Sequence, residues 1–357
     1  MNTMSSSRLP LVDFQHIDHG IGSNSEAFRN SKVLLTGASG FFGTWMLETL
    51  VWLNTSKSLN MAIHVVVRNT IAFKMGISSW TESQIKIIEG DLSTLIIYPD
   101  TYKYIIHLAS DQIRSDDVTS LFNHMSRSVS AANNLIALAK VCETDSILFT
   151  SSGAVYSDYL GLHSSGSPFV ENIQYAKDVQ NEKAIYSETK RYIELLFSTA
   201  SANLNFKVKI ARCFSFIGPF LPLNSNYAIG NFMRDALQGR DIVINGNGKP
   251  LRSYMYASDL ITFLLLILIK GRSGIPYNVG SPETYSIHEV AKMVRDISGA
   301  ITKIQILNLT PKDGAGDQYL PDLKNIINEF GLSDFVSLNS AIKKTLDWNK
   351  KYSLNNV

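Results

Sequence analysis

Short apolar segments that lack apolar–polar alternation constrain the fold of this chain most strongly. A strand with one face in water alternates, whereas a strand covered by helices on both faces is apolar throughout. Segments with helical periodicity, such as Phe42 to Leu53 and the segment around Ser128 to Val141, separate these stretches. We therefore predict an α/β protein with a parallel sheet covered on both faces. The predicted strands are residues 33–35, 63–67, 85–88, 104–108, 146–150 and 207–211.

A glycine-rich turn, TGASGFFG, follows the first predicted strand and precedes the first helix. Gly37, Gly40 and Gly43 recur there at every third position. Glycine lets the backbone turn tightly and approach a pyrophosphate, which rests on the helix N-terminus. The spacing alone is also compatible with a plain tight turn. In its strand–turn–helix context it predicts dinucleotide binding and a Rossmann-type, doubly wound sheet.

Arg68 directly follows the second predicted strand, where the residue that reads the adenosine ribose is expected. An acidic residue there accepts hydrogen bonds from a free 2′-hydroxyl, whereas an arginine can receive a 2′-phosphate. Arg68 thus favours NADP over NAD. If its side chain instead stacks on the adenine or points to water, it does not distinguish the two cofactors. Asp91, after the third strand, is predicted to bond the adenine edge, with a helix cap as the alternative.

Tyr186 and Lys190 lie four residues apart in the motif YSETK, which places them on one face of a helix. A free tyrosine titrates at about pH 10, so action as a base near neutrality requires a shift of about 3 units, roughly 4 kcal/mol. A neighbouring cation favours the phenolate and supplies part of that shift. On spacing alone, the pair is equally compatible with an ordinary exposed helix surface.

Composition excludes several classes of protein. With 45% apolar and 18% charged residues the chain of 357 residues is globular, and a net charge of +2 gives no argument for a nucleic-acid or membrane partner. The longest apolar run, Ile261 to Ile269, is too short to span a bilayer and reads as a core helix starting near Asp259. Cys142 and Cys213 lie in apolar surroundings and are predicted to be buried thiols.

The pattern also predicts the domain organisation. Residues 1–30 read as an N-terminal extension without a signal-peptide hydrophobic stretch, which predicts a cytoplasmic protein. A loose tail is the default for this extension, although Phe14, Ile17 and Ile21 allow it to pack onto the fold. Residues 31–217, joined by about 254–272, are the predicted Rossmann domain. Residues 218–253 and 273–357, rich in Pro, Asn and Gly at their start, are the predicted smaller, discontinuous C-terminal substrate lobe.

Five motifs occur in the order found in extended short-chain dehydrogenases/reductases, and they resemble the nucleotide-sugar epimerase/dehydratase branch of that family. They are TGASGFFG, HLAS (His107 to Ser110), SSGAVYS (Ser151 to Ser157), YSETK and RSYMYASD (Arg252 to Asp259). The resemblance covers roughly residues 31–349. It implies NADP or NAD as cofactor, a nucleotide-diphosphate sugar as substrate, and binding of that substrate by the C-terminal lobe.

The resemblance implies a role for each matching residue. Ser152 hydrogen-bonds the reacting sugar oxygen, Tyr186 is the base that moves the hydroxyl proton, and Lys190 holds the nicotinamide ribose and lowers the tyrosine pKa, with no metal needed. The implied cofactor-binding residues are Gly37, Ser39, Gly40, Phe41, Phe42, Gly43, Arg68, Asp91, Leu92, Leu108, Ala109, Ser110, Tyr186 and Lys190. The implied substrate-binding residues are Ser152, Gly153, Ser215, Asn231 and Arg252, of which Arg252 grips the diphosphate.

Two departures from the family pattern bear on the reaction. The two positions after the catalytic residue are Asp and Glu in the 4,6-dehydratases, and decarboxylases keep a Glu there. This chain has Gly153 and Ala154, which carry no proton-transferring group, so dehydration and decarboxylation are disfavoured. Ser215 replaces a usual Asn and reshapes the substrate pocket.

The SSGAVY pattern is more similar to 4-epimerases and ketosugar reductases, which need only a hydride and one proton. Arg68 favours the reductase and SSGAVY the epimerase, so both stay open. Two other readings are a non-enzymatic NAD(P) sensor and a reductase of non-sugar ketones. The intact Ser152, Tyr186 and Lys190 argue against the sensor.

Family members commonly form homodimers through a bundle of two helices from each subunit. The resemblance therefore implies a homodimer formed by the helix around Ser128 to Val141 and the helix carrying Tyr186 to Ala200. The same apolar faces are also compatible with burial inside one subunit.

Overall fold

The structure is a computed structural model that describes residues 7–95, 100–110, 118–159, 167–172, 184–224, 227–307 and 318–353. The chain divides into two compact units. Unit 1 comprises Met1–Val155, Asp178–Arg212 and Ile261–Tyr277, and unit 2 comprises Tyr156–Lys177, Cys213–Leu260 and Asn278–Val357. Each unit is therefore assembled from segments that are distant in sequence.

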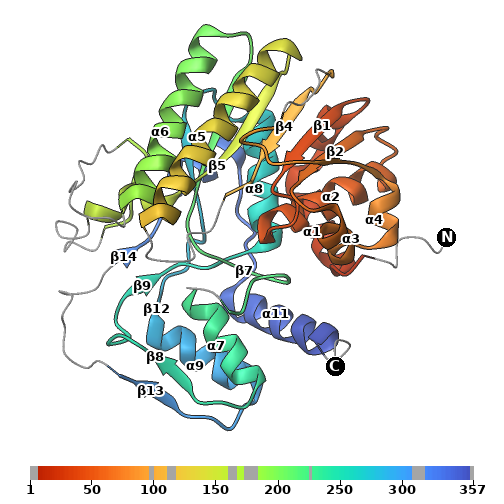
Figure 1. The fold of residues 1–357 in the computed structure, drawn as a ribbon. Helices are drawn as coiled ribbons and strands as arrows, with labels where there is room; N and C mark the ends of the chain where they lie inside the picture. Colours follow the sequence, from red (N-terminus) through yellow and green to blue (C-terminus); the bar gives the residue numbers. More distant parts are fainter. Residues whose placement is uncertain are drawn as a thin grey trace. The chain divides into compact units, whose positions relative to one another are not determined.

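A seven-stranded parallel sheet is built on unit 1 (Figure 1). Its strand order is β11-β6-β5-β4-β1-β2-β3, so the chain extends the sheet to one side of β1 and then returns to extend it on the other side. This reversal is the doubly wound arrangement, and the predicted α/β fold is confirmed. The strands are β1 (Lys32–Thr36), β2 (Ala62–Val67), β3 (Ile85–Glu89), β4 (Tyr104–His107), β5 (Ser146–Ser152), β6 (Lys207–Cys213) and β11 (Pro276–Val279).

The strand register aligns the carboxyl ends of the central strands. Thr36 at the end of β1 pairs with His107 at the end of β4, and His107 pairs with Phe149 of β5. The segments that follow these residues therefore emerge at the same edge of the sheet. That edge is where ligands bind in open α/β sheets.

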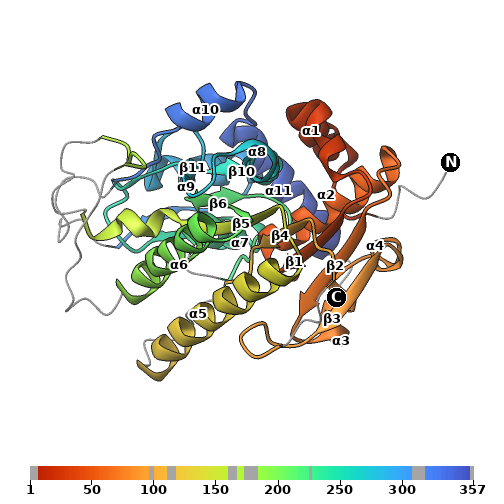
Figure 2. The same ribbon diagram turned by 90° about the horizontal axis from the view of Figure 1, so that it is seen from above.

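Helices cover both faces of the sheet. Figure 2 shows α5 (Val118–Val141) and α6 (Ala184–Asn203) on one face and α2 (Phe41–Ser56) on the other. Beneath α5 and α6 the two helices and the strands share one apolar core, so apolar side chains bury this face of the sheet. The other elements of this part are η2 (Gly22–Phe28), α3 (Thr70–Gly76), α4 (Ser79–Ser83), η3 (Gly153–Tyr159) and α8 (Ala257–Lys270).

Over its described part, residues 7–30, the N-terminal extension is not a loose tail, so the default prediction was wrong there. Residues Leu11–Ile21 form helix α1, and its apolar side chains Phe14, Ile17 and Ile21 are buried. The Phe14 ring stacks on Trp52 of α2, with ring centroids 5.5 Å apart and planes at 5°. The spacing i, i+3, i+7 gives α1 one apolar stripe, and burial of that stripe against unit 1 stabilises the helix.

Unit 2 is built from small sheets and helices. Strand β9 (Leu251–Arg252) lies between β12 (Tyr285–Ser286) and β14 (Gln318–Tyr319) in a three-stranded sheet. Two further pairs are β10 (Met255–Tyr256) with β7 (Phe216–Ile217) and β13 (Ile304–Ile306) with β8 (Ile242–Ile244). The helices are α7 (Ala228–Leu237), α9 (Ile287–Ser298), α10 (Lys324–Phe330) and α11 (Leu338–Ser353).

The apolar run 261–269 lies within α8, as predicted for a core helix, and its residues are almost all buried. Across the part of the chain that the structure describes, no helix is both long and apolar enough to cross a bilayer. Cys142 and Cys213 are buried free thiols, which confirms that prediction.

Candidate active site

The glycine turn between β1 and α2 depends on glycine at its first position. Gly37 has a φ of +77°, a left-handed conformation that side-chain-bearing residues rarely adopt. A Cβ atom there would lie 2.5 Å from the backbone nitrogen of Ala109, which follows β4. The turn and the end of β4 therefore pack backbone against backbone, which only glycine allows.

The other two glycines have different roles. A Cβ on Gly43 would lie 1.9 Å from the Gly37 carbonyl oxygen, so Gly43 lets α2 approach the turn. At Gly40, an added Cβ would meet only the Gly37 oxygen, at an ordinary 3.4 Å, and both Gly40 and Ser39 are exposed. Gly40 is also the N-cap residue of α2, and no side-chain hydrogen bond caps the helix there.

These features fit a dinucleotide phosphate. The N-terminus of a 16-residue helix presents backbone N–H groups and the positive end of its dipole, and at Gly40 no Cβ keeps a ligand away from them. Ser39, Gly40, Phe41 and Phe42 would hold the pyrophosphate. Leu108, whose N–H donates to the Thr36 carbonyl oxygen at 3.2 Å, and the following Ala109 and Ser110 line the same sheet edge.

Asp91 follows β3, and its carboxylate is already engaged. One oxygen accepts hydrogen bonds from the N–H and hydroxyl of Ser93 (3.0 and 2.8 Å), and the other pairs with Arg127 of α5 at 2.6 Å. Burial raises the pKa of Asp91, but the Ser93 bonds and the Arg127 charge outweigh it and hold the pKa below its usual value. The nearby Leu92 is buried in the core, whereas Arg68 is exposed just after β2.

Tyr186 and Lys190 lie together on α6, as their spacing requires. The Lys190 side chain is buried, with its Nζ 6.0 Å from the centroid of the Tyr186 ring. Nζ donates a hydrogen bond to the Thr150 carbonyl oxygen at 3.0 Å and lies 5.0 Å from the centroid of the Phe149 ring. The ammonium is thus fixed to β5, the strand that ends at Ser152.

Ser152 is half-buried at the end of β5, where its hydroxyl oxygen accepts a hydrogen bond from the Ala154 N–H at 3.1 Å. Gly153, buried, and Ala154 begin η3 without side-chain acids. This bond has the geometry of a cap at the end of a strand. It leaves the hydroxyl hydrogen available, because that bond uses the oxygen as acceptor.

His107, the last residue of β4, is buried near Lys190 and stays neutral. Its Nδ1 is 2.7 Å from the Thr36 hydroxyl, and its ring stacks on Phe149 with centroids 5.8 Å apart. Burial, and after it the positive charge of Lys190, lower the pKa of His107 to about 3. The imidazole therefore links β1 to β4 without adding a second positive charge beside Lys190.

This burial predicts a specific acid sensitivity. The unfolded chain binds a proton at His107 below about pH 6.5 and the folded chain does not, so this stability contribution is present above pH 6.5 and lost on acidification. Between pH 7 and pH 4 the loss attributable to His107 should be about 3 kcal/mol. Urea unfolding at a series of pH values should show a flatter dependence for His107→Gln than for the unaltered protein. The exposed His288, changed to Gln, should keep the full slope; equal slopes for all three proteins would contradict the prediction.

Sequence reasoning missed the residues that other elements bring to the site. His124 of α5 is buried beside Tyr186, with ring centroids 5.7 Å apart. Thr150 holds Lys190 through its backbone, and Arg127 of α5 pairs with Asp91. His124 and Arg127 sit three residues apart in the N-terminal half of α5, a segment that the predicted helix, starting around Ser128, did not include.

The residues predicted to bind substrate in unit 2 lie on separate elements of that unit. Arg252 is on β9, where its Nη1 donates to the Leu251 carbonyl oxygen at 2.8 Å and its guanidinium carbon is 5.9 Å from the centroid of the Tyr319 ring. Asn231 is on α7, and its side-chain oxygen accepts from Arg234 at 2.9 Å. Ser215 lies between β6 and β7 and is half-buried.

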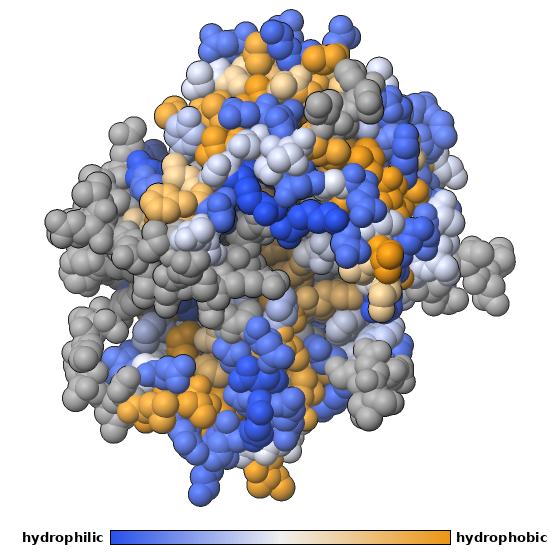
Figure 3. Space-filling view, in the orientation of Figure 1, coloured by the Kyte–Doolittle hydropathy of each residue, from blue (hydrophilic) through white to orange (hydrophobic). Residues whose placement is uncertain are grey.

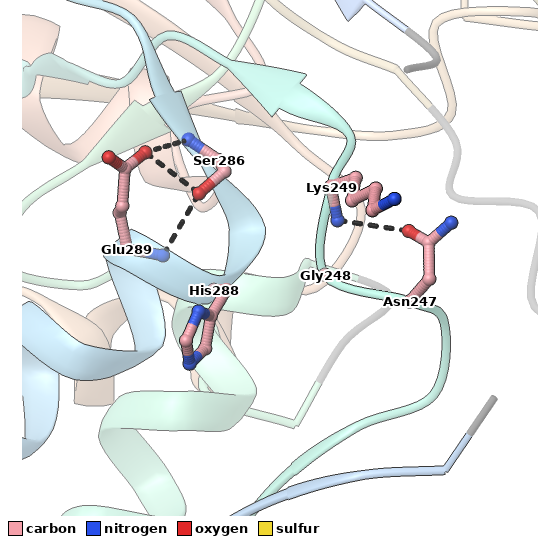
Figure 4. Close-up of a pocket in the computed structure, with 6 residues that line it drawn as sticks. All are labelled: Asn247, Gly248, Lys249, Ser286, His288 and Glu289. Atoms are coloured by element: carbon pink, nitrogen blue, oxygen red, sulfur yellow. Dashed lines mark hydrogen bonds between the residues drawn. The ribbon is translucent and has the colours of Figure 1, made fainter. Parts of the chain in front are cut away.

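A surface pocket of unit 2 lies between the β8–β9 connection and the start of α9 (Figure 4). There Ser286 and Glu289 form a reciprocal capping box for α9, and Asn247 accepts a hydrogen bond from the Lys249 N–H at 2.9 Å. These polar groups serve the local fold. The lining residues are Asn247, Gly248, Lys249, Ser286, His288 and Glu289, a set that includes no predicted site residue.

The chain is similar to known proteins over most of its length. The model of the NAD dependent epimerase/dehydratase family matches residues 33–280. UDP-glucuronic acid decarboxylase 1 of Xenopus tropicalis is 24% identical over 322 residues, which are 90% of this chain and 72% of that protein.

Two solved structures share the fold. UDP-N-acetylglucosamine 4-epimerase of Methanobrevibacter ruminantium M1, in complex with UDP-N-acetylmuramic acid, superposes with a TM-score of 0.77 at 19% identity, covering 90% of this chain and 99% of that one. A mutant UDP-glucuronic acid 4-epimerase of Bacillus cereus, in complex with UDP-4-deoxy-4-fluoro-glucuronic acid and NAD, gives 0.72 at 21% identity with coverages of 90% and 99%.

Proposed function

The chain belongs to the NAD dependent epimerase/dehydratase family, and from that premise we propose that it oxidises or reduces carbon 4 of a nucleotide-linked hexose, as a 4-epimerase or a 4-ketosugar reductase. The observation that carries this proposal is the Tyr186–Lys190 pair on α6, whose ammonium is bonded to Thr150 of β5. That strand ends at Ser152, which is followed by Gly153 and Ala154. These side chains suffice for one proton and one hydrogen bond at a sugar oxygen.

Each of the three residues has one task in the proposed reaction. A bound nicotinamide cofactor would supply hydride transfer from or to carbon 4. Tyr186 accepts the proton of the 4-hydroxyl as the carbonyl forms and returns it when the carbonyl is reduced. The Lys190 ammonium favours the phenolate that accepts this proton, and the Ser152 hydroxyl donates a hydrogen bond to the reacting oxygen.

Decarboxylation of a UDP-uronic acid is the second candidate, because the Xenopus tropicalis relative carries that name. Loss of carbon dioxide from a 4-keto intermediate leaves an enolate at carbon 5 that must be protonated, a step beyond the hydride and proton moved at carbon 4. Gly153 and Ala154 supply no acid for that step. We therefore prefer the reaction at carbon 4 to decarboxylation. We propose UDP as the nucleotide of the substrate, because the relative and the two structural neighbours are named for UDP-sugars.

Product analysis tests the proposal. The protein is incubated with a panel of nucleotide sugars and 4-keto sugars, with and without NADPH, and products are resolved by mass and NMR. We expect either unchanged mass with altered sugar couplings or a gain of two hydrogens. A product that has lost water or carbon dioxide would instead establish dehydration or decarboxylation.

The cofactor separates the two versions of the proposal. Arg68 supports NADP and the reductase, whereas the Bacillus cereus neighbour holds NAD. An epimerase regenerates its cofactor in every turnover and retains it, while a reductase exchanges it. Mass analysis of what the purified protein releases on denaturation therefore distinguishes them, with stoichiometric NAD indicating the epimerase.

Arg252 is proposed to bind the diphosphate of the substrate, because its planar guanidinium matches phosphate oxygens in a bidentate manner. Arg252→Ala should raise the KM for a UDP-sugar about 30-fold with little change in kcat, since a charge-assisted bidentate contact contributes about 2 kcal/mol. The exposed Arg240 of unit 2, changed to Ala, is the matched control and should leave KM unchanged. An unaltered KM in Arg252→Ala would support a substrate without a diphosphate, such as an apolar ketone.

A homodimer through α5 and α6 is also proposed. Large apolar side chains point outward on both helices: Phe122 and Met125 of α5 are 64% and 38% exposed, and Tyr192 and Leu195 of α6 are 47% and 64% exposed. Figure 3 shows apolar residues, in orange, scattered among polar ones, in blue, on the face in view. The spacing of three residues on each helix forms apolar stripes suited to a bundle of two helices from each subunit.

We expect the unaltered protein to be a dimer in solution. A single charged residue introduced into the apolar stripe of α6 should dissociate it. Leu195→Glu buries a carboxylate in the proposed interface and should yield monomers at micromolar concentration in sedimentation equilibrium. Met75→Glu on α3, where the side chain is 82% exposed, is the control and should remain dimeric. An unaltered protein that sediments as a monomer at all concentrations would rule the proposed interface out.

A further inference from the structure

His124 occupies a position on α5 where a polar side chain is costly. It is only 4% exposed, although its neighbours Asn123 and Met125 are exposed. The helix turns Leu121 and His124 inward while Phe122 points to the surface. Removing imidazole nitrogens from water costs free energy that an apolar side chain would not cost. Because burial of this histidine costs stability, we expect its ring to have a function.

The imidazole lies against the ring of Tyr186. The two ring centroids are 5.7 Å apart and the planes meet at 38°. The two residues come from different helices, α5 and α6, which pack side by side in both views (Figures 1 and 2). The phenol is thus contacted from outside its own helix by a ring that is itself fixed by burial.

Lys190 is held by a different part of the structure. Its ammonium donates to the Thr150 carbonyl oxygen and lies nearer to the Phe149 ring (5.0 Å) than to the Tyr186 ring (6.0 Å). The ammonium supplies charge beside the phenol while being attached to β5. The orientation of the Tyr186 ring relative to that charge therefore depends on what packs against the ring, and proton transfer tolerates only about 0.5 Å of misplacement.

We propose that His124 is a positioning residue that acts through Tyr186. Its imidazole restrains the phenol ring so that the hydroxyl keeps its reactive orientation beside the Lys190 ammonium. His124 exchanges no proton with the substrate in this account. The proposal rests on the proposed function, because it requires Tyr186 to be the group that moves the proton.

Three variants test this role: His124→Ala removes the ring, His124→Gln keeps size and polarity without a ring, and His124→Phe keeps an aromatic ring. With UDP-glucose and UDP-glucuronic acid as substrate probes, His124→Ala and His124→Gln should lower kcat about tenfold with KM within twofold of the unaltered protein. His124→Phe should restore kcat to within about threefold. Asn123→Ala, which changes the exposed neighbour of His124 on α5, should have no effect.

A second readout needs no turnover. In protein labelled with ¹³C at the tyrosine ζ-carbon, the NMR signal absent from Tyr186→Phe identifies Tyr186. That signal should move in His124→Ala and His124→Gln and stay near its original position in His124→Phe. If the alanine variant fails to fold, the contrast between Gln and Phe carries the test.

The outcomes separate this inference from the function it rests on. An unmoved Tyr186 signal together with unchanged kcat in His124→Gln overturns the role of His124 and leaves the function intact. Full activity in Tyr186→Phe overturns the proposed function, whatever the His124 variants do.

Discussion

Replacing Tyr186 by phenylalanine should lower kcat about a thousandfold, because the change deletes the one atom that moves the proton and preserves the ring. General acid–base catalysis by a positioned side chain contributes typically about 10²- to 10⁴-fold, so a loss of about 4 kcal/mol in transition-state stabilisation is expected. The ring contacts with Lys190 and His124 persist in this variant. Cofactor binding should therefore remain close to that of the unaltered protein.

The measurement is kcat on the nucleotide sugar that the product panel identifies, together with isothermal titration of the cofactor. Tyr192→Phe is the matched control, because Tyr192 lies on the same helix with its side chain 47% exposed. It should retain full activity. Turnover in Tyr186→Phe that equals that of Tyr192→Phe would exclude the phenol as the proton carrier.

Replacing Gly43 by alanine should abolish measurable cofactor binding and also destabilise the fold. The new Cβ would lie 1.9 Å from the Gly37 carbonyl oxygen, so α2 must move away from the turn. Overpacking of this kind costs about 1–3 kcal/mol, and a displaced helix N-terminus no longer presents its N–H groups to a phosphate. We expect the cofactor Kd to rise at least about 100-fold, with a lower unfolding midpoint in urea.

Alanine variants of two other glycines separate the effect on cofactor binding from the effect on fold stability. Gly40→Ala introduces a Cβ at an ordinary 3.4 Å from its neighbour, so stability should be retained while cofactor binding weakens through lost access to the backbone. Gly76→Ala, on α3, places its Cβ in open space and should change neither property. If Gly43→Ala and Gly40→Ala bound cofactor like Gly76→Ala, the turn would not be the phosphate site.

The fold was predictable because its signals are local. The six predicted strands are bounded in the structure within a few residues of the predicted ranges. Helix α5 was predicted too short, because Ser126, Arg127 and Ser128 interrupt its polar–apolar pattern, although the backbone hydrogen bonds continue through them. The N-terminal helix was missed because a loose tail is the default expectation for residues 1–30. Its apolar stripe of Phe14, Ile17 and Ile21 stabilises the helix only by packing against residues distant in sequence, such as Trp52.

In the candidate site, too, the local pairings were predictable from sequence and the contacts between different elements were not. Tyr186 and Lys190 could be paired from sequence because a helix fixes residues four apart. The partners that come from elsewhere could not, since Thr150 acts through its backbone and His124 belongs to another helix. Asp91 illustrates the same limit: its position in the sequence predicts a contact with the adenine edge, whereas its bonds to Ser93 and Arg127 are seen only in the structure.

The chemistry at carbon 5 decides between the proposed reaction and the one named for the Xenopus tropicalis relative. A 4-epimerase or 4-ketosugar reductase never breaks or forms a bond to hydrogen at carbon 5. Decarboxylation and 4,6-dehydration both pass through a carbanion-like carbon 5 that takes a proton from solvent. Gly153 and Ala154 leave this chain without the carboxyl groups that the resemblance assigns to that step.

The most direct test is therefore the proton NMR spectrum of the product formed in D₂O from a UDP-hexose or UDP-hexuronic acid, and from a 4-keto UDP-hexose supplied with NADPH. The account predicts a product with altered H4 couplings or a new H4, and with the H5 signal retained at full intensity. Solvent deuterium at carbon 5 would contradict it, whether the deuterium replaces H5, as in dehydration, or stands beside H5 in place of a lost carboxylate, as in decarboxylation.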